Sequence, residues 1–307
     1  MPAYRLVMRA ARIFKRHGWR TEIHTVAAPE RVEDCARDAA RAGLDVVVVA
    51  GGDGTLGQAA AGLAGSSTAL AVLPSGSANV WAQELRLPRL GWFDWLALDR
   101  AARALVHGRV HRIDVGRFNG EVFLLWAGVG LDAIVVRRRE PPRRGRRQFA
   151  MGTYFAEAVW SAMDWHGVDL TARTESQEIR GHYLMAVVTN IHAYGGGLVT
   201  LAPDARVDDG WLDLWLFGGR SFAETLQRAW TLFTGRHLHD PNVQHMRFQS
   251  LRLEADTPAG LQLDGEPRRG SFPMEVQVWP SALNVLAPSD APRSLFVDNV
   301  GRALPGD

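Results

Sequence analysis

The sequence of 307 residues contains very little lysine and cysteine, and each shortage excludes a class of site. Lys15 is the only lysine, so the motif Gly-x-x-x-x-Gly-Lys-[Ser/Thr] of P-loop nucleotide-binding proteins does not occur. Cys35 is the only cysteine, which excludes an intramolecular disulfide and a cysteine-based zinc cluster. The histidines have no metal-ligand spacing, since no His-Glu-x-x-His pattern is found.

Long apolar runs are also missing. The longest run, residues 123–131, has nine residues and includes two glycines, whereas a membrane-spanning helix needs about 18 or more. Arg5, Arg9 and Arg12 interrupt the first apolar positions, which is unlike a signal peptide. We therefore expect a cytoplasmic protein that at most touches the inner face of the membrane.

The composition is that of a globular protein, with 47% hydrophobic and 22% charged residues. The length suffices for about two domains. The formal net charge is +2, and its positive part is almost entirely arginine.

A strand followed by a glycine-rich turn stands out in residues 44–58. Residues 46–50 predict a strand buried on both faces, as in a parallel sheet. The turn Gly51-Gly52-Asp53-Gly54-Thr55 follows, and we expect Thr55 to cap a helix that runs to about residue 64. Such a turn at a helix N-terminus favours phosphate binding. Because a carboxylate repels bare phosphate, we expect Asp53 to serve a phosphate-bound Mg²⁺ or a hydroxyl.

A second unit of the same kind follows in residues 68–85, with a strand over 68–73, a turn over 74–79 and a helix to residue 85. Ser77 and Asn79 offer polar groups at the start of this helix, where a simple N-cap is the alternative interpretation. Ligands bind at the carboxyl ends of parallel strands, so both turns should lie at one edge of the sheet.

The rest of the chain divides into a helical first part and a strand-rich second part. We expect helices over 4–17, 29–42 and 92–107 and a strand over 19–26, which is α/β winding that begins on a helix. A hairpin over 110–127 with the turn Asn119-Gly120 follows, then a short helix after residues 128–133 and a helix over 149–165. Further strands are predicted over 168–174, 179–189, 211–217, 243–255, 261–263, 274–279 and 283–286, with a helix over 221–234.

This pattern predicts an α/β domain over 1–108, a β-sandwich or open barrel over 109–287, and a tail over 288–307. The tail is either loosely ordered or returns to the first domain. The arginine-rich segment 137–147 is a solvated loop or a contact for anionic lipid, and no recognition motif points to nucleic acid.

Four more motifs occur together with the glycine turn. Residues 74–79, Pro-Ser-Gly-Ser-Ala-Asn, look like a Pro-x-Gly-Thr-x-Asn turn with serine for threonine. The others are Gly128-Val129-Gly130-Leu131-Asp132-Ala133, the segment from Asn190 to Asp213, and Leu263-Asp264-Gly265-Glu266-Pro267. In this order they resemble the bacterial diacylglycerol/lipid kinase family, of the same superfamily as NAD kinase. The resemblance implies an NAD kinase-like, three-layer α/β domain followed by a β-rich sandwich or barrel.

The resemblance also implies an activity: ATP-dependent, Mg²⁺-requiring transfer of the γ-phosphate to a lipid hydroxyl, from diacylglycerol to phosphatidic acid in phospholipid biosynthesis. The partner is then a lipid substrate at the membrane surface. The resemblance leaves open whether the protein forms a homodimer. The alternatives are a kinase for another lipid or for a small metabolite such as NAD, and a catalytically impaired relative that binds nucleotide or membrane.

The resemblance assigns roles to individual residues. Glu266 or Asp264 takes the proton of the acceptor hydroxyl, and Asp53 acts through Mg²⁺ near the γ-phosphate. A structural Mg²⁺ lies at Asp209, with backbone oxygens of Arg206 and Trp211 as further ligands. The residues implied to contact ATP are Thr25, Gly51, Gly52, Asp53, Gly54, Thr55, Leu56, Gly57, Gln58, Ser77 and Asn79. Without the family context, both Asp264-Gly265 and Asp209-Gly210 are ordinary hairpin turns.

One departure from the family pattern concerns the first strand. The family opens with a strand that ends in a phosphate-binding turn, whereas here the first element is the following helix. Either the start codon is misassigned or the protein lacks part of its ATP site. We expect the native product to begin upstream, by a length of about 15–25 residues for a strand and a loop.

Overall fold

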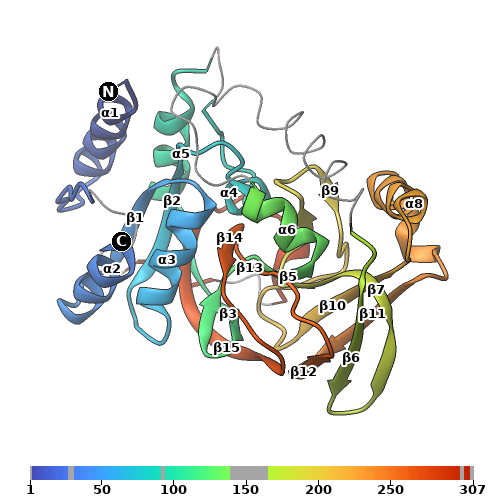
Figure 1. Ribbon diagram of the computed structural model, residues 1–307. Helices are drawn as coiled ribbons and strands as arrows, with labels where there is room; N and C mark the ends of the chain where they lie inside the picture. Colours follow the sequence, from blue (N-terminus) through green and yellow to red (C-terminus); the bar gives the residue numbers. More distant parts are fainter. Residues whose placement is uncertain (1, 27–30, 91–93, 139–164, 298–300, 305–307) are drawn as a thin grey trace. The chain divides into compact units, whose positions relative to one another are not determined.

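A computed structural model describes residues 2–26, 31–90, 94–138, 165–297 and 301–304 (Figure 1). The chain forms two compact units. The first unit comprises residues 1–115, 206–209 and 280–307, and the second comprises 116–205 and 210–279. Among the described helices, none combines the length and the apolar character that crossing a bilayer requires.

The first unit is an α/β domain built on parallel strands. β1 (Val46–Gly51) pairs with β2 (Ala69–Pro74) in parallel, with Val46 opposite Ala69 and Gly51 opposite Pro74. On the other side of β2, the last part of β15 (Met274–Ala287) pairs in parallel through Asn284 and Val285. The helices of this unit are α1 (Pro2–Arg16), α2 (Val32–Arg41), α3 (Asp53–Leu63), α4 (Val80–Glu84) and α5 (Ala97–Val106).

The helices of the first unit pack in two pairs, α1 with α5 and α2 with α3, while α3 and α5 both contact β2. Arg9 of α1 makes an ion pair of 2.7 Å with Asp99 of α5. At the crossing of α2 and α3, a Cβ on Gly62 would lie 2.3 Å from the carbonyl oxygen of Glu33, so only glycine permits this approach. Every residue of β2 is buried. The predicted α/β domain is confirmed.

Three expectations for this unit are wrong. β1 is only half-buried, because in the described part of the chain β2 is its single neighbour in the sheet. Residues 19–26 form no strand, because Trp19 stacks on Phe14 of α1 and the residues after it find no partner strand. The helix after β1 begins at Asp53 with Gly52 as its N-cap, so Thr55 lies inside the first turn and does not cap it.

The segment after β15 belongs to the first unit, as the second of the two alternatives for the tail expects. Leu295 is the last residue of the short 3₁₀-helix η3 (Arg293–Leu295), and Phe296 follows it. Both side chains are fully buried. The N–H of Val207 donates to the carbonyl of Leu295, and Val110 forms a β-bridge with Arg302. The predicted division at residues 108 and 287 stays a prediction.

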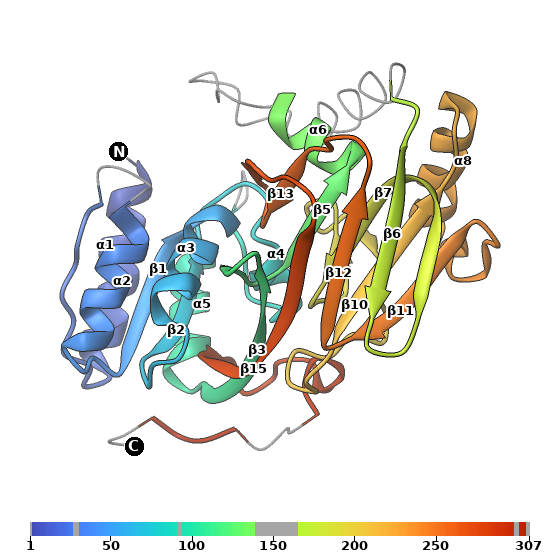
Figure 2. The same cartoon turned by 60° about the horizontal axis from the view of Figure 1, so that its bottom comes forward.

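The second unit is an antiparallel β-domain. Its sheet order runs β12-β6-β7-β5-β13-β14, and β10 joins β7 on one side and β11 on the other. Figure 2 shows β12 beside β6. The first part of β15 pairs with β12 in antiparallel fashion. β3 (Arg109–Phe118) begins in the first unit and ends in the second, which starts at Gly116. The other strands are β4 (Glu121–Phe123), β5 (Trp126–Gly130), β6 (Val168–Thr174), β7 (Glu178–Thr189), β8 (Ala193–Tyr194), β9 (Val199–Thr200), β10 (Leu212–Gly218), β11 (Val243–Phe248), β12 (Ser250–Ala255), β13 (Leu261–Leu263) and β14 (Glu266–Arg268).

The core of the second unit follows from alternation along its strands. Leu212, Leu214 and Leu216 of β10 point into a cluster that includes Phe248 and Val276, as strand geometry requires of every second residue. The helical elements are α6 (Leu131–Arg138), α8 (Phe222–Phe233) and the 3₁₀-helix η2 (Arg236–His239). The predicted sandwich-like second domain is confirmed.

The predicted strands are recovered with three differences. The expected hairpin strand over 121–127 is divided, since β4 ends at Phe123 and β5 begins at Trp126. The expected strand over 243–255 is two strands separated at Gln249, and the expected strands over 274–279 and 283–286 form the single strand β15. Its partner changes from β12 to β2 along its length, so one strand serves two ladders. The hairpin turn at Asn119-Gly120 is confirmed, with φ of 48° and 87°. Residues 139–164, which hold most of the predicted basic loop and the helix over 149–165, lie outside the described residues.

Candidate active site

The two glycine-containing turns of the first unit lie side by side. The carbonyl oxygen of Gly51 accepts hydrogen bonds from the N–H groups of Ser75 (3.2 Å) and Gly76 (3.1 Å). Asn79 closes the second turn: its Oδ1 accepts from the Gly76 N–H at 3.1 Å and its Nδ2 donates to the Gly76 carbonyl at 2.8 Å. The expectation that both turns meet at one sheet edge is confirmed.

The turns touch backbone to backbone. A Cβ on Gly76 would lie 2.4 Å from the Cα of Gly52, which is far inside van der Waals contact. A Cβ on Gly52 would meet the Cα of Gly76 at an ordinary 3.5 Å. Glycine is therefore a steric requirement at position 76, and at position 52 it chiefly keeps the backbone accessible.

The carboxylate of Asp53 connects the first turn to α4, the helix that follows the second turn. Asp53 is the first residue of α3, and its Oδ1 accepts a hydrogen bond of 3.3 Å from the N–H of Trp81 in α4. Burial raises the pKa of the Asp53 carboxyl, and hydrogen bonds from backbone N–H groups of α4 oppose this effect only in part. A desolvated carboxylate beside open glycine backbone is a suitable ligand for a divalent cation that carries phosphate.

The other residues expected to contact ATP fall into two groups. Thr25 and Ser77 are exposed, whereas Leu56 and Gly57 are buried in α3. Gln58, one position further along α3, has a buried Oε1 with no hydrogen-bond partner among the described residues. An unsatisfied buried acceptor fits a ligand that donates a hydrogen bond, such as a nucleotide hydroxyl or amino group. The roles of these residues stay predictions.

In the second unit, Asp264 and Gly265 form the tight turn between β13 and β14, both with positive φ (50° and 82°). The Asp264 carboxylate accepts three backbone hydrogen bonds, from Leu124 (2.8 Å), Leu125 (2.7 Å) and Trp126 (3.1 Å). It thereby fixes the turn to the segment between β4 and β5. Glu266, the first residue of β14, is half-buried.

A buried polar chain supports this turn from behind. Asp132 accepts hydrogen bonds of 2.6 Å from the Tyr194 hydroxyl and of 2.6 Å from Nε2 of Gln262, and burial raises the pKa of its carboxyl. Oε1 of Gln262 accepts from the Gly265 N–H at 2.7 Å. The sequence motifs contained Asp132 and Tyr194 but gave them no role, and Gln262 was missed. The sequence feature that could have indicated this chain is the presence of three polar residues in segments expected to be buried.

The loop around residue 209 stays a candidate for Mg²⁺. Oδ1 of Asp208 accepts a hydrogen bond of 2.6 Å from the Val297 N–H, and the guanidinium of Arg206 donates to the Phe296 carbonyl at 2.8 Å. Asp209 is half-buried, and Trp211 lies in the second unit. Across the described residues, no three His, Cys, Asp or Glu side chains cluster as a metal site. One carboxylate with backbone carbonyls is still a hard-oxygen set suited to Mg²⁺.

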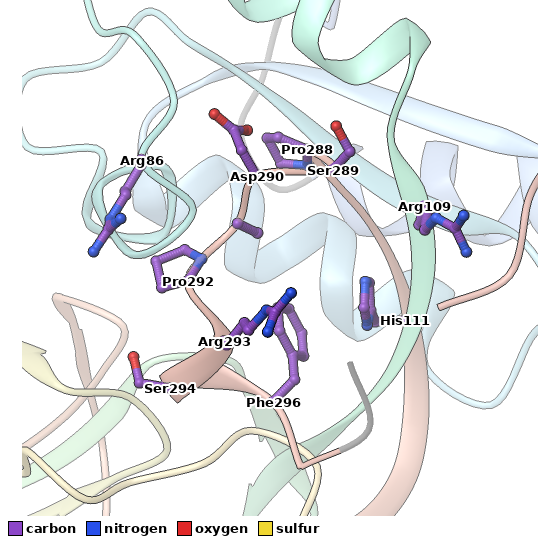
Figure 3. Close-up of a pocket in the computed structure, with 11 residues that line it drawn as sticks. Arg86, Arg109, His111, Pro288, Ser289, Asp290, Pro292, Arg293, Ser294 and Phe296 are labelled. Carbon is purple, nitrogen blue, oxygen red and sulfur yellow. The ribbon is translucent and has the colours of Figure 1, made fainter. Parts of the chain in front are cut away.

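The first unit also contains a cavity of about 590 Å³ (Figure 3). The ring of His111 stacks on Phe296 at 4.2 Å in its wall, and Arg293 extends toward them. None of the predicted site residues lines it. The lining residues are Arg86, Arg109, His111, Pro288, Ser289, Asp290, Ala291, Pro292, Arg293, Ser294 and Phe296.

Comparisons with known proteins agree with this architecture. Residues 3–118 match the model of the diacylglycerol kinase catalytic domain, and residues 126–287 match that of the YegS C-terminal NAD kinase beta sandwich-like domain. A diacylglycerol kinase of Bacillus subtilis (strain 168) is 25% identical over 255 residues, covering 82% of this chain and 81% of the relative. One from Staphylococcus saprophyticus is 28% identical over 272 residues, covering 86% and 84%.

Solved structures show the same fold. The crystal structure of a diacylglycerol kinase from Bacillus anthracis str. Sterne superimposes with a TM-score of 0.71 at 17% identity, covering 94% of this chain and 93% of that one. With both family models matched in order over the two units, the chain belongs to the bacterial diacylglycerol kinase family.

Proposed function

We propose that the protein is an ATP-dependent lipid kinase that transfers the γ-phosphate of ATP to the hydroxyl of diacylglycerol, giving phosphatidic acid. The observation that carries the proposal is the pair of touching glycine turns with the half-buried Asp53 of α3 hydrogen-bonded to the backbone of α4. Membership of the diacylglycerol kinase family supports ATP use. The names of the relatives support diacylglycerol as the acceptor.

We assign nucleotide binding to the first unit. Gly51 and Gly52 lead into α3, which begins at Asp53 and whose N-terminus favours phosphate. Asp53 would hold Mg²⁺, which when bound neutralises phosphate charge during transfer. The unsatisfied Oε1 of Gln58 offers a hydrogen-bond acceptor to the nucleotide.

We assign acceptor activation to the Asp264–Glu266 turn of the second unit, with Glu266 as the general base. Both oxygens of Asp264 already accept backbone N–H groups, so that carboxylate is suited to positioning the turn. Phosphoryl transfer depends chiefly on positioning and charge neutralisation. A base held on a tight turn supplies the remaining step, removal of the hydroxyl proton.

The test is a kinase assay with radiolabelled ATP over a panel of acceptors. The purified chain would be given diacylglycerol, other hydroxyl-bearing lipids and NAD, each with MgCl₂, and the product extracted into organic solvent. Label in the organic phase with diacylglycerol, lost in Asp53→Ala, is the expected result. Label transferred to another lipid identifies that lipid as the substrate, and label that stays on NAD in water overturns a lipid acceptor. ATP binding without transfer to any acceptor indicates a catalytically impaired relative.

A further inference from the structure

Helix α8 (Phe222–Phe233) turns an apolar face to solvent. Leu226, Trp230 and Phe233 are 40%, 61% and 66% exposed, and they recur at spacings of four and three residues, which places them on one side of the helix. The rings of Trp230 and Phe233 stack with their centroids 6.5 Å apart. Leu238 of η2, the next element, is also exposed at 46%. Figures 1 and 2 show α8 at the outside of the second unit.

The inward side of α8 is largely polar: of its three buried residues, Thr225 and Arg228 are polar and only Leu232 is apolar. Arg228 is buried and makes an ion pair with Asp240, which is buried as well. Thr225 is also buried, and the hydroxyl of Thr231 donates to Oδ2 of Asp240 at 3.3 Å. A helix on the surface of a globular protein normally has the opposite arrangement, with its apolar stripe inward.

This orientation is fixed by specific contacts. Rotating the helix to bury Trp230 and Phe233 would separate Arg228 from Asp240 and leave a buried charge without its partner. At the N-terminus, Oγ of Ser221 accepts from the Glu224 N–H at 3.3 Å, and Oε2 of Glu224 accepts from the Arg220 N–H at 2.8 Å. This capping box holds the first turn in place.

The charges around the face match an anionic surface. Glu224, the only carboxylate of α8, is engaged in the capping box. Arg220 and Arg236 are exposed and flank the helix at its two ends, and His239 is exposed nearby. The exposed positions of the helix itself carry no charge; they are Ala223, Leu226, Gln227, Ala229, Trp230 and Phe233. Tryptophan, phenylalanine and leucine on one face with arginines beside it are typical of helices that lie in a bilayer interface.

We propose that α8, with Leu238, docks onto an anionic lipid bilayer, its exposed face entering the boundary between headgroups and acyl chains. The choice of a bilayer rests on the proposed function, since the acceptor is then a lipid. A second copy of the chain fits less well, because a stable interface takes about 20–30 residues from each partner. The exposed apolar face supplies four side chains.

The test compares two double variants in vesicle co-sedimentation. Trp230→Gln with Phe233→Gln removes the aromatic part of the face. Trp95→Gln with Leu96→Gln is the matched control, because Trp95 and Leu96 are exposed at 59% and 55% and belong to the first unit. Vesicles of phosphatidylcholine with phosphatidylglycerol are the probe, and thermal unfolding checks that both variants fold.

We expect the α8 variant to bind these vesicles at least tenfold more weakly than the wild type, and the control to bind like the wild type. The difference should persist at high salt, because salt screens charges and leaves apolar insertion intact. Equal binding by the wild type and the α8 variant, or no binding by the wild type, overturns the proposal. A wild-type dimer that becomes a monomer in the α8 variant while vesicle binding stays unchanged also overturns it.

Kinase assays separate this proposal from the proposed function. The α8 variant should lose activity on diacylglycerol in vesicles and keep it on a short-chain diacylglycerol dispersed as monomers. A wild type that binds vesicles through α8 and phosphorylates no lipid refutes the proposed function and leaves membrane docking supported.

Discussion

Two carboxylates two residues apart have different surroundings, and this difference distinguishes their expected roles. Asp264 accepts three backbone N–H groups, whereas Glu266 begins the strand beyond the turn. The turn itself is held by Gln262, which Asp132 orients.

Glu266→Gln should lower kcat at least about 10²-fold, the range of general base catalysis, and leave stability and ATP affinity nearly unchanged.

Asp264→Asn should instead lower the free energy of unfolding by about 2–3 kcal/mol, since an amide NH₂ would face backbone N–H groups that lose their acceptor. Urea unfolding and steady-state kinetics measure both. If Asp264→Asn were as stable as the wild type and equally inactive, Asp264 would be the base.

Asp53→Asn should raise thermal stability relative to the wild type near neutral pH and at the same time abolish kinase activity. Burial raises the pKa of Asp53 in the folded state above its unfolded value of about 3.9, so the folded state holds the proton more tightly. The stabilising contribution of Asp53 is therefore complete below about pH 4 and is lost as pH rises through the raised folded pKa. The asparagine variant does not titrate, so its Tm relative to the wild type should increase from pH 4 to 7 while kinase activity disappears. A pH-independent difference in Tm would contradict this.

At the scale of elements, the contact between the two turns should depend on one glycine. Gly76→Ala places a methyl group against the backbone of Gly52 and should lower the free energy of unfolding by about 1–3 kcal/mol, with at least tenfold weaker ATP binding. Gly52→Ala is the matched control, because its Cβ meets only an ordinary contact of 3.5 Å and should leave stability nearly unchanged. Equal losses of stability in both variants would show that the close approach is unimportant.

The seating of α8 on the second unit should depend on its buried ion pair. Arg228→Leu leaves Asp240 buried without its partner and should cost about 3–5 kcal/mol. Arg236→Gln, at an exposed arginine just beyond the helix, should change stability by less than about 0.5 kcal/mol. Chemical unfolding of the three proteins measures both effects, and a negligible loss for Arg228→Leu would mean that packing alone positions the helix.

At the scale of the whole molecule, the last segment of the chain should be part of the first unit's core. Deleting residues 288–307 removes the fully buried Leu295 and Phe296, and burial of two such side chains contributes about 3–6 kcal/mol. It also removes the hydrogen bonds that Val207 and Asp208 make with Leu295 and Val297. We expect the truncated chain to unfold at clearly lower urea concentration. An unchanged midpoint would mean that the segment is a loosely attached tail after all.

The sequence alone determined the fold class, most helices and strands, and the two glycine-containing turns. These features arise from local rules: hydrophobic periodicity for the elements, positive φ for Asn119-Gly120 and Asp264-Gly265, and a β-branched run that ends in glycines. It failed where a segment depends on a distant partner. Residues 19–26 alternate like a strand but pair with no described strand. Residues 274–286 were expected as two strands and form one, which pairs with β12 in its first part and with β2 in its last part.

Only the tertiary structure decided which polar groups are already engaged. The hydrogen bonds of Asp264 come from residues about 140 positions earlier in the chain, and those of Asp132 come from Tyr194 and Gln262. Likewise, periodicity gives α8 an apolar face but does not say that the face points outward, since Arg228 and Asp240 meet only in the folded chain. Composition and spacing fix which groups are available, and long-range packing fixes which of them remain for a substrate or a membrane.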